Sequence, residues 1–341
     1  MADIGVGLVG YGLGGRVFHA PFVQAVSGMQ LRAVVSSDPA KVHAQLPGMT
    51  VAPTLEALLQ QADIDLVIVS SPDALHAEHV VASLGAGKHV LVDKPMATSL
   101  SDAHRMSEAA ERAGKLLTVF QNRRWDADFL TLKRLIAEGR LGRLVHFESH
   151  FDRWRPQSAD VWKEAREGGS WFDLGPHLVD QAVCLFGKPQ AVTADIATLR
   201  EGAPAPDWFH VVLHYSGLRA VLHSNKLAAD HGLRFAVHGT GGSWIKHGLD
   251  TQEPAIVAGG RPNDEDFGVD PNAGVYSPAE DPTRRETTSN ERGDYKQFWR
   301  ALTLALRGEG LNPVPPAEAV CVMEVLHAGL ESAAKGMTVR I

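Results

Sequence analysis

The stretch IGVGLVGYGLGG, from Ile4 to Gly15, decides the fold of the amino-terminal part of the chain. Ile4 to Val9 read as an apolar strand, and Gly10, Gly12 and Gly15 then follow the spacing G-x-G-x-x-G. A strand that breaks into glycines and resumes as a helix gathers free backbone N–H groups at the positive helix end, which suits a pyrophosphate. The pattern alone also fits an ordinary turn, but its flanks favour a dinucleotide-binding loop that includes Leu13.

Apolar strands and helical segments alternate from this loop to Asn122. Runs too apolar to have a wet face predict a parallel sheet covered by helices on both sides, with right-handed crossovers. The later strands are expected at Leu31–Val35, Leu66–Val69, His89–Val92 and Leu116–Phe120. Helices are expected within Leu55–Gln61, Ala74–Ala86 and Ser101–Ala113. Residues 1–122 are therefore predicted to form a doubly wound Rossmann dinucleotide-binding domain.

The stretch HVLVDKPMA, from His89 to Ala97, places a lysine at the end of one of these strands. Pro95 forbids continuation of the strand because it lacks a backbone donor and fixes its own φ. Asp93 and Lys94 are thus expected at the carboxyl end of the parallel strands. Ligands bind at that edge in open parallel sheets, so both side chains are predicted to face a ligand.

The pattern changes after Asn122, and residues 123–341 are expected to form a second α/β domain. Helices are predicted at Asp126–Gly139, as one long helix within Gly168–Phe186, and at Asp294–Arg307 and Ala317–Lys335. The last helices are expected to pack back on the first domain. Strands with short connections predict a largely antiparallel sheet, at Val145–Phe151, Val192–Leu199, Phe209–Tyr215, Ala220–Ser224, Phe235–His238 and Ser243–Lys246. Glu253–Asn290, rich in Pro, Gly and acidic residues, resembles an extended surface loop.

Composition narrows the class of partner. The chain has 341 residues, 44% hydrophobic and 21% charged, and a net charge of -7 without a dense Lys/Arg tract. Nucleic acid and anionic membranes are therefore unexpected partners, and a small molecule is expected instead. Apolar runs stay short of membrane-spanning length and no basic leader precedes the first strand, which predicts a cytoplasmic protein. Cys184 and Cys321 are expected as buried thiols, and a disulfide is the less favoured alternative.

A second polar group of residues lies near the start of the predicted long helix. Asp173, His177 and Asp180 have helical spacing, and the first two are i, i+4 neighbours. Pro176 suits a first helical turn, so Asp173 as an N-cap and His177 as a core histidine are the plainer interpretation. An enzyme with a dinucleotide-binding fold that oxidises an alcohol needs a group to accept the hydroxyl proton, however. A histidine oriented by a carboxylate gains and loses a proton near neutral pH and so suits this role.

These motifs together resemble the glucose-fructose oxidoreductase / inositol dehydrogenase (Gfo/Idh/MocA) family over nearly the whole chain. The strings His19-Ala20-Pro21, Asn122–Asp126, Phe147–Arg153 and Asn312–Pro315 are similar to its NADP-dependent scyllo-inositol dehydrogenase branch. The resemblance implies a Rossmann domain followed by an α/β domain whose open-faced sheet forms a homo-oligomer, a dimer or tetramer. It also implies the catalytic residues. His177 takes the hydroxyl proton, Lys94 hydrogen-bonds the same oxygen, and Asp173 orients the histidine or relays its proton. The family commonly has Glu where this chain has Asp93.

Cofactor choice is read from the end of the second strand. Ser36 and Ser37, with Lys41 one turn later, predict a site for the 2′-phosphate of NADP. If the strand runs further, Asp38 becomes the ribose ligand and NAD is favoured. The resemblance adds contacts from Ser71, Pro72, His76 and Asp93. His76 and His79 form an H-x-x-H pattern, which on a helix is compatible with a metal site. The sequence offers no third ligand at a suitable spacing, so no metal is expected.

Substrate contacts are expected from Asn122, Arg123 and Trp154, together with Asp173 and His177. The function predicted is hydride transfer between a nicotinamide and a secondary alcohol or ketone of an inositol-like polyol or sugar. Two alternatives stay open: a non-enzymatic cofactor-sensing protein, and a family glycosidase that uses the nicotinamide transiently. A sensor needs neither Lys94 nor His177, so the presence of both favours the enzyme.

Overall fold

The computed structural model describes residues 2–157, 168–230 and 232–341, and the chain divides into two compact units. The first comprises Met1–Asn122, Gln252–Phe267 and Asp294–Val320, and the second comprises Arg123–Thr251, Gly268–Gly293 and Cys321–Ile341. Two later segments of the chain thus belong to the first unit. None of the described helices is both long and apolar enough to cross a membrane.

The first unit is built on a six-stranded parallel sheet with the order β3-β2-β1-β4-β5-β6. Its strands are β1 (Ile4–Val9), β2 (Met29–Val35), β3 (Thr50–Ala52), β4 (Leu66–Val69), β5 (His89–Val92) and β6 (Leu117–Val119). The predicted Rossmann architecture is confirmed. β3 was not predicted, because its three residues include the exposed Thr50 and make no apolar run. The strand order reverses between β1 and β4, where this architecture binds ligands.

The helices of this unit cover the sheet and connect its strands. They are the π-helical turn η1 (Gly14–His19), α1 (Ala20–Ala25), α2 (Pro39–His43), α3 (Leu55–Leu59), the 3-10 turn η2 (Asp73–Leu75), α4 (His76–Gly85), α5 (Leu100–Ala113), α9 (Gln252–Val257) and α10 (Lys296–Leu306). α10 belongs here because its aromatic side chains enter the core: Trp299 and Phe298 lie 5.8 and 5.1 Å from the ring of Phe120. The hydroxyl of Thr118 on β6 donates to the carbonyl of Val314 at 3.0 Å, which ties the segment after α10 to the sheet.

The second unit is built on a nine-stranded sheet with the order β14-β13-β12-β11-β7-β10-β9-β8-β15. The strands are β7 (Leu144–His150), β8 (Ala191–Ala197), β9 (Trp208–Tyr215), β10 (Leu218–Asn225), β11 (Leu233–Gly239), β12 (Gly242–His247), β13 (Gly274–Pro278), β14 (Glu286–Thr288) and β15 (Val339–Arg340). β7 and β10 pair in parallel and the other recorded pairs are antiparallel, which confirms the largely antiparallel sheet.

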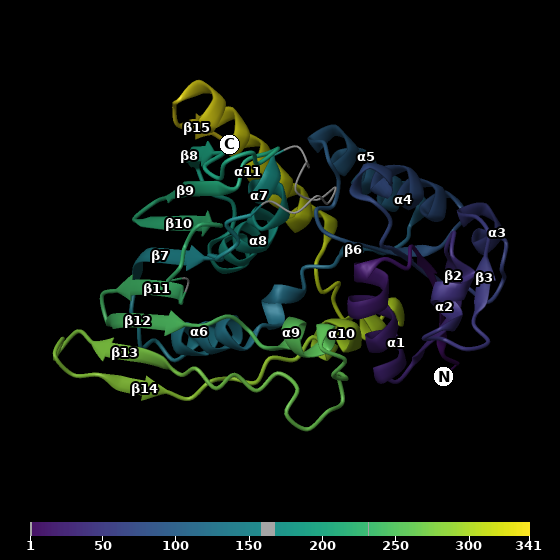
Figure 1. Ribbon diagram of the computed structural model, residues 1–341, viewed down its shortest axis with the longest axis horizontal. Helices are drawn as coiled ribbons and strands as arrows, with labels where there is room; N and C mark the ends of the chain where they lie inside the picture. The colour runs from purple at the N-terminus through teal and green to yellow at the C-terminus, as the bar shows by residue number, and fades with distance from the viewer. Residues whose placement is uncertain (1, 158–167, 231) are drawn as a thin grey trace. The chain divides into compact units, whose positions relative to one another are not determined.

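The expectation of a surface loop over Glu253–Asn290 is wrong. The segment contributes α9 and the edge strands β13 and β14, visible at the lower edge of the sheet in Figure 1. The buried indole of Trp244 on β12 donates to the hydroxyl of Thr288 on β14 at 3.0 Å, and that hydroxyl donates to the carbonyl of Gly274. The Tyr276 hydroxyl on β13 also donates to the carbonyls of Arg140 and Gly241, so contacts with distant residues hold this short hairpin and local sequence did not reveal it.

The second unit contains α6 (Ala127–Ala137), α7 (Gly169–Asp173) and α8 (Gly175–Phe186). It also contains most of η3 (Asn122–Trp125) and of α11 (Pro316–Lys335), whose residues Asn122 and Pro316–Val320 belong to the first unit. α7 packs on β9 and α8 on β10, so both cover the same sheet. The long helix predicted within Gly168–Phe186 is α8, which has Pro176 in its first turn; the short helix α7 precedes it, and the chain breaks between them at Leu174. Cys184 and Cys321 are thiols and are half-buried, not fully buried as expected.

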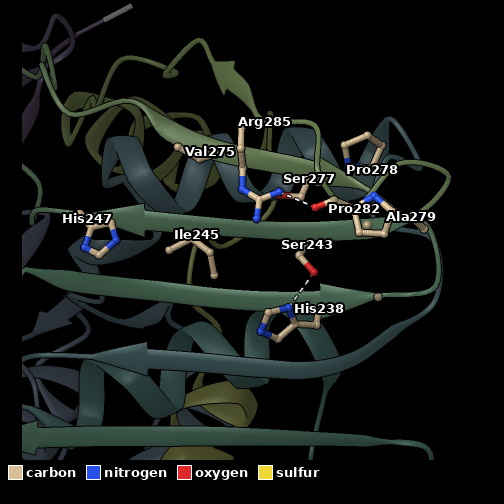
Figure 2. Close-up of a pocket in the computed structure, with 12 residues that line it drawn as sticks. His238, Ser243, Ile245, His247, Val275, Ser277, Pro278, Ala279, Pro282 and Arg285 are labelled. Atoms are coloured by element: carbon tan, nitrogen blue, oxygen red, sulfur yellow. Dashed lines mark hydrogen bonds between the residues drawn. The ribbon is translucent and has the colours of Figure 1, made fainter.

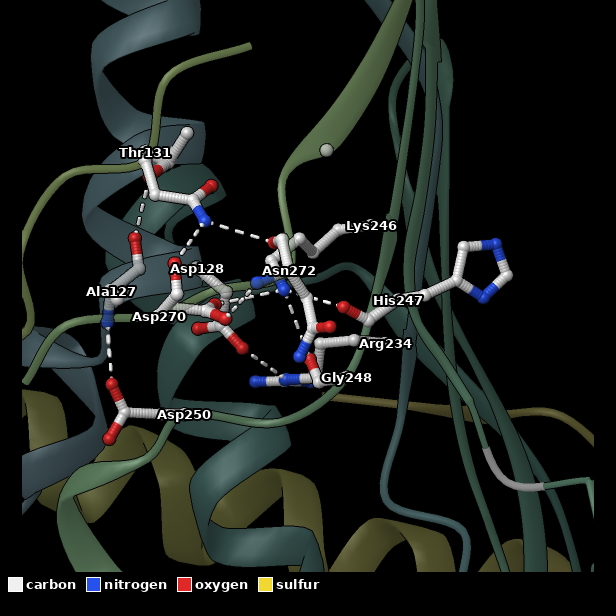
Figure 3. Close-up of polar contacts among 12 residues, drawn as sticks. Ala127, Asp128, Thr131, Arg234, Lys246, His247, Gly248, Asp250, Asp270 and Asn272 are labelled. Atoms are coloured by element: carbon white, nitrogen blue, oxygen red, sulfur yellow. Dashed lines mark hydrogen bonds and ion pairs between the residues drawn. The ribbon is translucent and has the colours of Figure 1, made fainter. Parts of the chain in front are cut away.

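Ion pairs fully removed from solvent lie between α6 and the sheet (Figure 3). The guanidinium of Arg234 on β11 lies 2.9 Å from the carboxylate of Asp128 on α6, and the ammonium of Lys246 on β12 lies 2.9 Å from Asp270. All four side chains have 0% exposure. The carboxylate of Asp250 accepts the first backbone N–H of α6, from Ala127, at 2.8 Å. Because breaking a buried pair strands a charge, the Arg234–Asp128 pair and the Asp250 contact hold α6 in one position, whereas the Lys246–Asp270 pair ties β12 to the segment before β13.

Candidate functional site

The glycine loop of the first unit has the conformation that its sequence predicts. Gly10 has φ +98°, and a Cβ there would lie 2.5 Å from the carbonyl oxygen of Ser70. A Cβ at Gly15 would lie 2.2 Å from the carbonyl oxygen of Gly10. No atom of the described residues comes within 4 Å of the corresponding position at Gly12. Gly10 and Gly15 thus serve the packing of the loop, whereas Gly12 leaves open space that fits a pyrophosphate.

Asp93 lies at the carboxyl end of β5 and is held by two neighbours. His19 Nε2, at the end of η1, lies 2.9 Å from Asp93 Oδ1, and the Ser70 hydroxyl donates to Oδ2 at 2.6 Å. Burial raises the pKa of Asp93, but the charge and hydrogen bond of His19 and the Ser70 hydroxyl outweigh it and lower that pKa to about 2. A Cβ at Gly14 would lie 2.8 Å from this carboxylate. The anion therefore stands directly beside the glycine loop.

Lys94 follows Asp93 in a short turn whose position is set by His76. The Lys94–Pro95 peptide bond is cis, and Lys94 is half-buried. His76 is 1% exposed, with Nδ1 lying 3.0 Å from the carbonyl oxygen of Pro95 and Nε2 lying 3.0 Å from that of Ser71. The imidazole therefore joins the turn that carries Lys94 to the chain after β4. This bridging position was not expected from the sequence.

Ser71 and His79 complete this edge of the sheet. The Ser71 hydroxyl lies 2.9 Å from Nδ1 of His79. Burial lowers the pKa of His79, which favours its neutral form. Pro72 precedes η2. The carboxyl ends of β1, β4 and β5 thus bring together Gly12, Ser71 and Lys94 within one unit, where the parallel sheet would receive a dinucleotide.

The end of β2 supplies the residues that bear on cofactor choice. β2 ends at Val35, and Ser36, Ser37 and Lys41 follow it. The carboxylate of Asp38 accepts the backbone N–H of Lys41 at 3.0 Å and caps α2, while the Ser36 hydroxyl accepts the backbone N–H of Asp38 at 3.1 Å. Ser37 and Lys41 are exposed. Asp38 therefore serves the local backbone, and the two exposed side chains are positioned for solvent or a ligand.

Asp173 and His177 lie on either side of the break between α7 and α8 in the second unit. Asp173 ends α7 and is half-buried, whereas His177 lies in the first turn of α8 and is 7% exposed. Leu174, not Asp173, occupies the N-cap of α8, so the capping interpretation of Asp173 is wrong. The His177 ring meets Phe151 edge to face, with centroids 6.2 Å apart.

Buried polar contacts hold α8 and thereby His177. Arg124 donates through Nε and Nη2 to the two carboxylate oxygens of Asp180, at 2.8 and 2.6 Å. The next residue, Gln181, donates to the carbonyl oxygen of Arg123 at 2.9 Å and accepts from Arg234 at 2.7 Å. The bidentate pair fixes the rotation of α8 about its axis.

Arg123 and Arg234 also flank the aromatic ring beside His177. Their guanidinium carbons lie 4.8 and 4.5 Å from the centroid of Phe151. Arg123 Nη1 lies 3.3 Å from Asp126, whose pKa is raised well above its ordinary value by burial and by the nearby Asp250 carboxylate. The sequence singled out Arg123, but it contained no signal for Phe151 or Arg234, because strand pairing alone brings them together.

The remaining predicted substrate residues have different surroundings. Asn122 follows β6 in the first unit and is 5% exposed. Trp154 is 54% exposed and forms an isolated bridge with Leu227. Arg153 lies next to it, with its guanidinium carbon 5.6 Å from the Phe151 centroid.

A pocket that the sequence did not predict lies on the sheet of the second unit (Figure 2). Side chains of β11, β12 and β13 and of the connection to β14 line it, and Figure 2 shows His238 and Ser243 joined by a hydrogen bond of 2.8 Å. It contains none of the predicted catalytic or cofactor residues.

Comparison with known proteins matches both parts of the chain. Residues 4–121 match the oxidoreductase family, NAD-binding Rossmann fold, and residues 133–341 match the oxidoreductase family, C-terminal alpha/beta domain. The chain is 46% identical over 334 residues to the uncharacterized oxidoreductase YdgJ of Escherichia coli, covering 97% of this chain and 96% of the relative. It is 36% identical over 344 residues to the scyllo-inositol 2-dehydrogenase (NADP(+)) IolW of Bacillus subtilis, covering 99% and 96%.

The fold is shared with solved structures. A crystal structure from Klebsiella pneumoniae matches with a TM-score of 0.94 and 44% identity, covering 100% of this chain and 96% of that one. Together the two domain matches cover nearly the whole described chain. The chain therefore belongs to the Gfo/Idh/MocA family of oxidoreductases.

Proposed function

We propose that this protein is a nicotinamide-dependent dehydrogenase that transfers hydride to and from a secondary alcohol carbon of an inositol-like polyol or sugar. One observation carries the proposal: Lys94 stands at the carboxyl end of β5, in the same unit as the open loop at Gly12 and next to a carboxylate held by His19. The ammonium group of a lysine at that position is suited to hydrogen-bond the reacting oxygen of a substrate. The 36% identity to a scyllo-inositol 2-dehydrogenase supports the substrate class.

The roles follow from the chemistry of alcohol oxidation. A bound nicotinamide supplies the hydride acceptor. His177 takes the hydroxyl proton, and Lys94 hydrogen-bonds the same oxygen and stabilises the charge that develops on it. Asp173 orients His177 or relays its proton. Arg123 and Asn122 contact the substrate, and Trp154 borders it. In the direction of reduction, His177 returns the proton to the new alcohol.

We propose NADP as the preferred cofactor. β2 ends before Ser36, and the Asp38 carboxylate is engaged by the backbone N–H of Lys41, which leaves Ser37 and the Lys41 ammonium exposed for a 2′-phosphate. The alternative is NAD bound through Asp38, whose carboxylate is exposed and uses Oδ1 for the cap. The relative IolW is named for NADP, which agrees with the proposal.

We also propose that the protein is a homo-oligomer that associates through the open face of the nine-stranded sheet. Val212, Val221, Ala236, Ile245 and Val275 are register neighbours across that face, interrupted by Glu148. An apolar row of this length on a strand face favours burial against a second copy. Light scattering on the full chain should give the mass of a dimer or tetramer, and the mass of a single chain at micromolar concentration would refute this arrangement.

The Lys94→Ala variant tests the dehydrogenase. We expect turnover of the best substrate in a screen of inositols, aldoses and ketoses to fall by roughly 100-fold or more, while NADPH binding changes by less than about threefold. Lys335→Ala, on an exposed helix surface, is the matched control and should keep full turnover.

Three results would contradict the proposal in different ways. Normal turnover by Lys94→Ala would refute the assigned mechanism. Tight cofactor binding with no turnover of any tested polyol or sugar by the native protein would favour the cofactor-sensing alternative. Cleavage of a glycoside without net change in nicotinamide absorbance would favour the glycosidase.

A further inference from the structure

Three side chains with metal-ligating atoms meet on the open face of the nine-stranded sheet. His150 ends β7, Asp152 follows it, and His223 lies on β10. One ligand atom from each lies within 4.8 Å of those of the other two. We propose that these three residues, called here the His150 cluster, bind a divalent transition-metal ion of the zinc class. This site goes beyond the dehydrogenase function and is independent of it.

Strand pairing explains why the three residues meet. β7 and β10 are parallel neighbours, and His150 and His223 are direct register partners. Asp152 lies two residues beyond His150, so its side chain leaves the chain on the same face. The backbone N–H of Asn225 donates to Asp152 Oδ1 at 2.8 Å, which holds the carboxylate next to both histidines. The cluster is thus built by the sheet, not by mobile side chains at a loop.

The distances between ligand atoms suit a small ion. A tetrahedral zinc ion with bonds of about 2.0–2.1 Å requires ligand atoms about 3.3 Å apart. His150 Nδ1 lies 2.9 Å from Asp152 Oδ2, and His223 Nε2 lies 3.6 Å from Asp152 Oδ1. These two separations lie on either side of the required value. The two distances use different oxygens of Asp152, and the three ligand atoms lie within 4.8 Å of one another, so an ion would draw the histidine nitrogens together around the carboxylate.

A metal-binding histidine usually donates its other ring N–H to a carboxylate or a carbonyl, and Glu148 is placed to accept this hydrogen bond from His150. Its Oε1 lies 2.8 Å from Nε2 of His150, the ring nitrogen on the side away from Asp152, and its Oε2 lies 3.3 Å from Nε2 of His146. When Nε2 carries the hydrogen that Glu148 accepts, Nδ1 has a lone pair directed at the ion. A carboxylate in this relation to a ligating histidine fixes its tautomer and its orientation.

The donor set selects the class of ion. Two imidazole nitrogens and one carboxylate oxygen are typical of zinc and its neighbours, whereas magnesium and calcium prefer oxygen ligands alone. Water would complete the coordination, and the side chain of His223 keeps 15% exposure in the single chain, before the proposed association of two copies through this face. The expectation of no metal rested on His76 and His79; the His150 cluster escaped it because β-pairing, not local spacing, brings His223 to the other two.

Cobalt(II) titration of the full chain, stripped of metal with a chelator, tests the site. Tetrahedral cobalt absorbs strongly in the visible range, and zinc should then displace it. We expect His223→Gln and Asp152→Asn to weaken zinc binding by roughly 100-fold, and Glu148→Gln by about tenfold, as outer-contact losses usually do. His214→Gln is the matched control, because His214 lies on the same face but hydrogen-bonds Thr193.

Circular dichroism and thermal unfolding of each metal-free variant establish that it is folded, and any variant that fails is replaced by Asp152→Glu or His223→Ala. Three results would overturn the proposal: native affinity for zinc in both folded ligand variants, an equal loss in His214→Gln, or tighter binding of magnesium than of zinc. A loss confined to the cluster variants, with the cobalt absorption removed in each, would establish it.

Discussion

The glycines of the loop after β1 have different physical tasks although they belong to one pattern. Gly10 and Gly15 are required by the protein's own backbone, because a Cβ at either would overlap a carbonyl oxygen. Gly12 faces open space. A sequence pattern cannot separate these tasks, since it records only that each position is glycine; the packing around each position does so.

This difference predicts opposite outcomes for two alanine variants. Gly12→Ala should change the free energy of unfolding by less than about 0.5 kcal/mol and raise the Kd for NADPH roughly tenfold, a loss of about 1.4 kcal/mol. Gly15→Ala should destabilise the fold by about 2 kcal/mol through overpacking. Denaturant unfolding and fluorescence titration measure the two quantities, and a stable Gly15→Ala would contradict the assignment.

The proposed preference for NADP over NAD depends on a single residue, Lys41. If its exposed ammonium contacts a 2′-phosphate, Lys41→Ala should weaken NADPH binding by about tenfold and leave NADH binding unchanged. Titration of tryptophan fluorescence with each reduced nicotinamide measures both affinities, with Lys335→Ala as the control. A native preference for NADH, or an equal loss for both cofactors, would instead favour Asp38 as the ribose ligand.

Among the helices and strands, the break between α7 and α8 determines how Asp173 and His177 are placed, more than the lengths of the two helices do. The spacing of Asp173 and His177 predicts neighbours on one helix, but Leu174 interrupts that helix and places the two residues on different ones. Gly175 packs against the ring of Trp171, where a Cβ would lie only 2.7 Å away. Pro176 lacks the backbone N–H that a continuous helix would use, so this proline is the local signal in the sequence for the break.

The buried pair between Arg124 and Asp180 should dominate the stability of this region. Asp180→Asn leaves a buried guanidinium without its charge partner and should lower the free energy of unfolding by about 3 kcal/mol. Glu331→Gln breaks an exposed pair with Lys335 and should cost less than about 0.5 kcal/mol. Thermal unfolding of both variants decides the matter, and similar shifts in the two would show that the buried pair does not anchor α8.

For the whole molecule, the sequence predicts the architecture well and the site only in part. The strands of the first unit are apolar and locally encoded, so their order follows from the crossover rules. The assignment of residues 252–267 and 294–320 to the first unit depends on contacts between distant segments, such as Phe22 with Tyr295 at 6.1 Å. The contacts of Arg234 with Asp128, and the His150 cluster, share that origin and leave no trace in local spacing.

The central proposal is that Lys94 and His177 act on one substrate oxygen. Turnover by Lys94→Ala, by His177→Ala and by the double variant tests it, with the best substrate from the polyol screen. Residues that act as one group give losses that do not multiply. We predict that the double variant is about as slow as the slower single variant; losses that multiply, or a single variant with native turnover, would contradict the proposal.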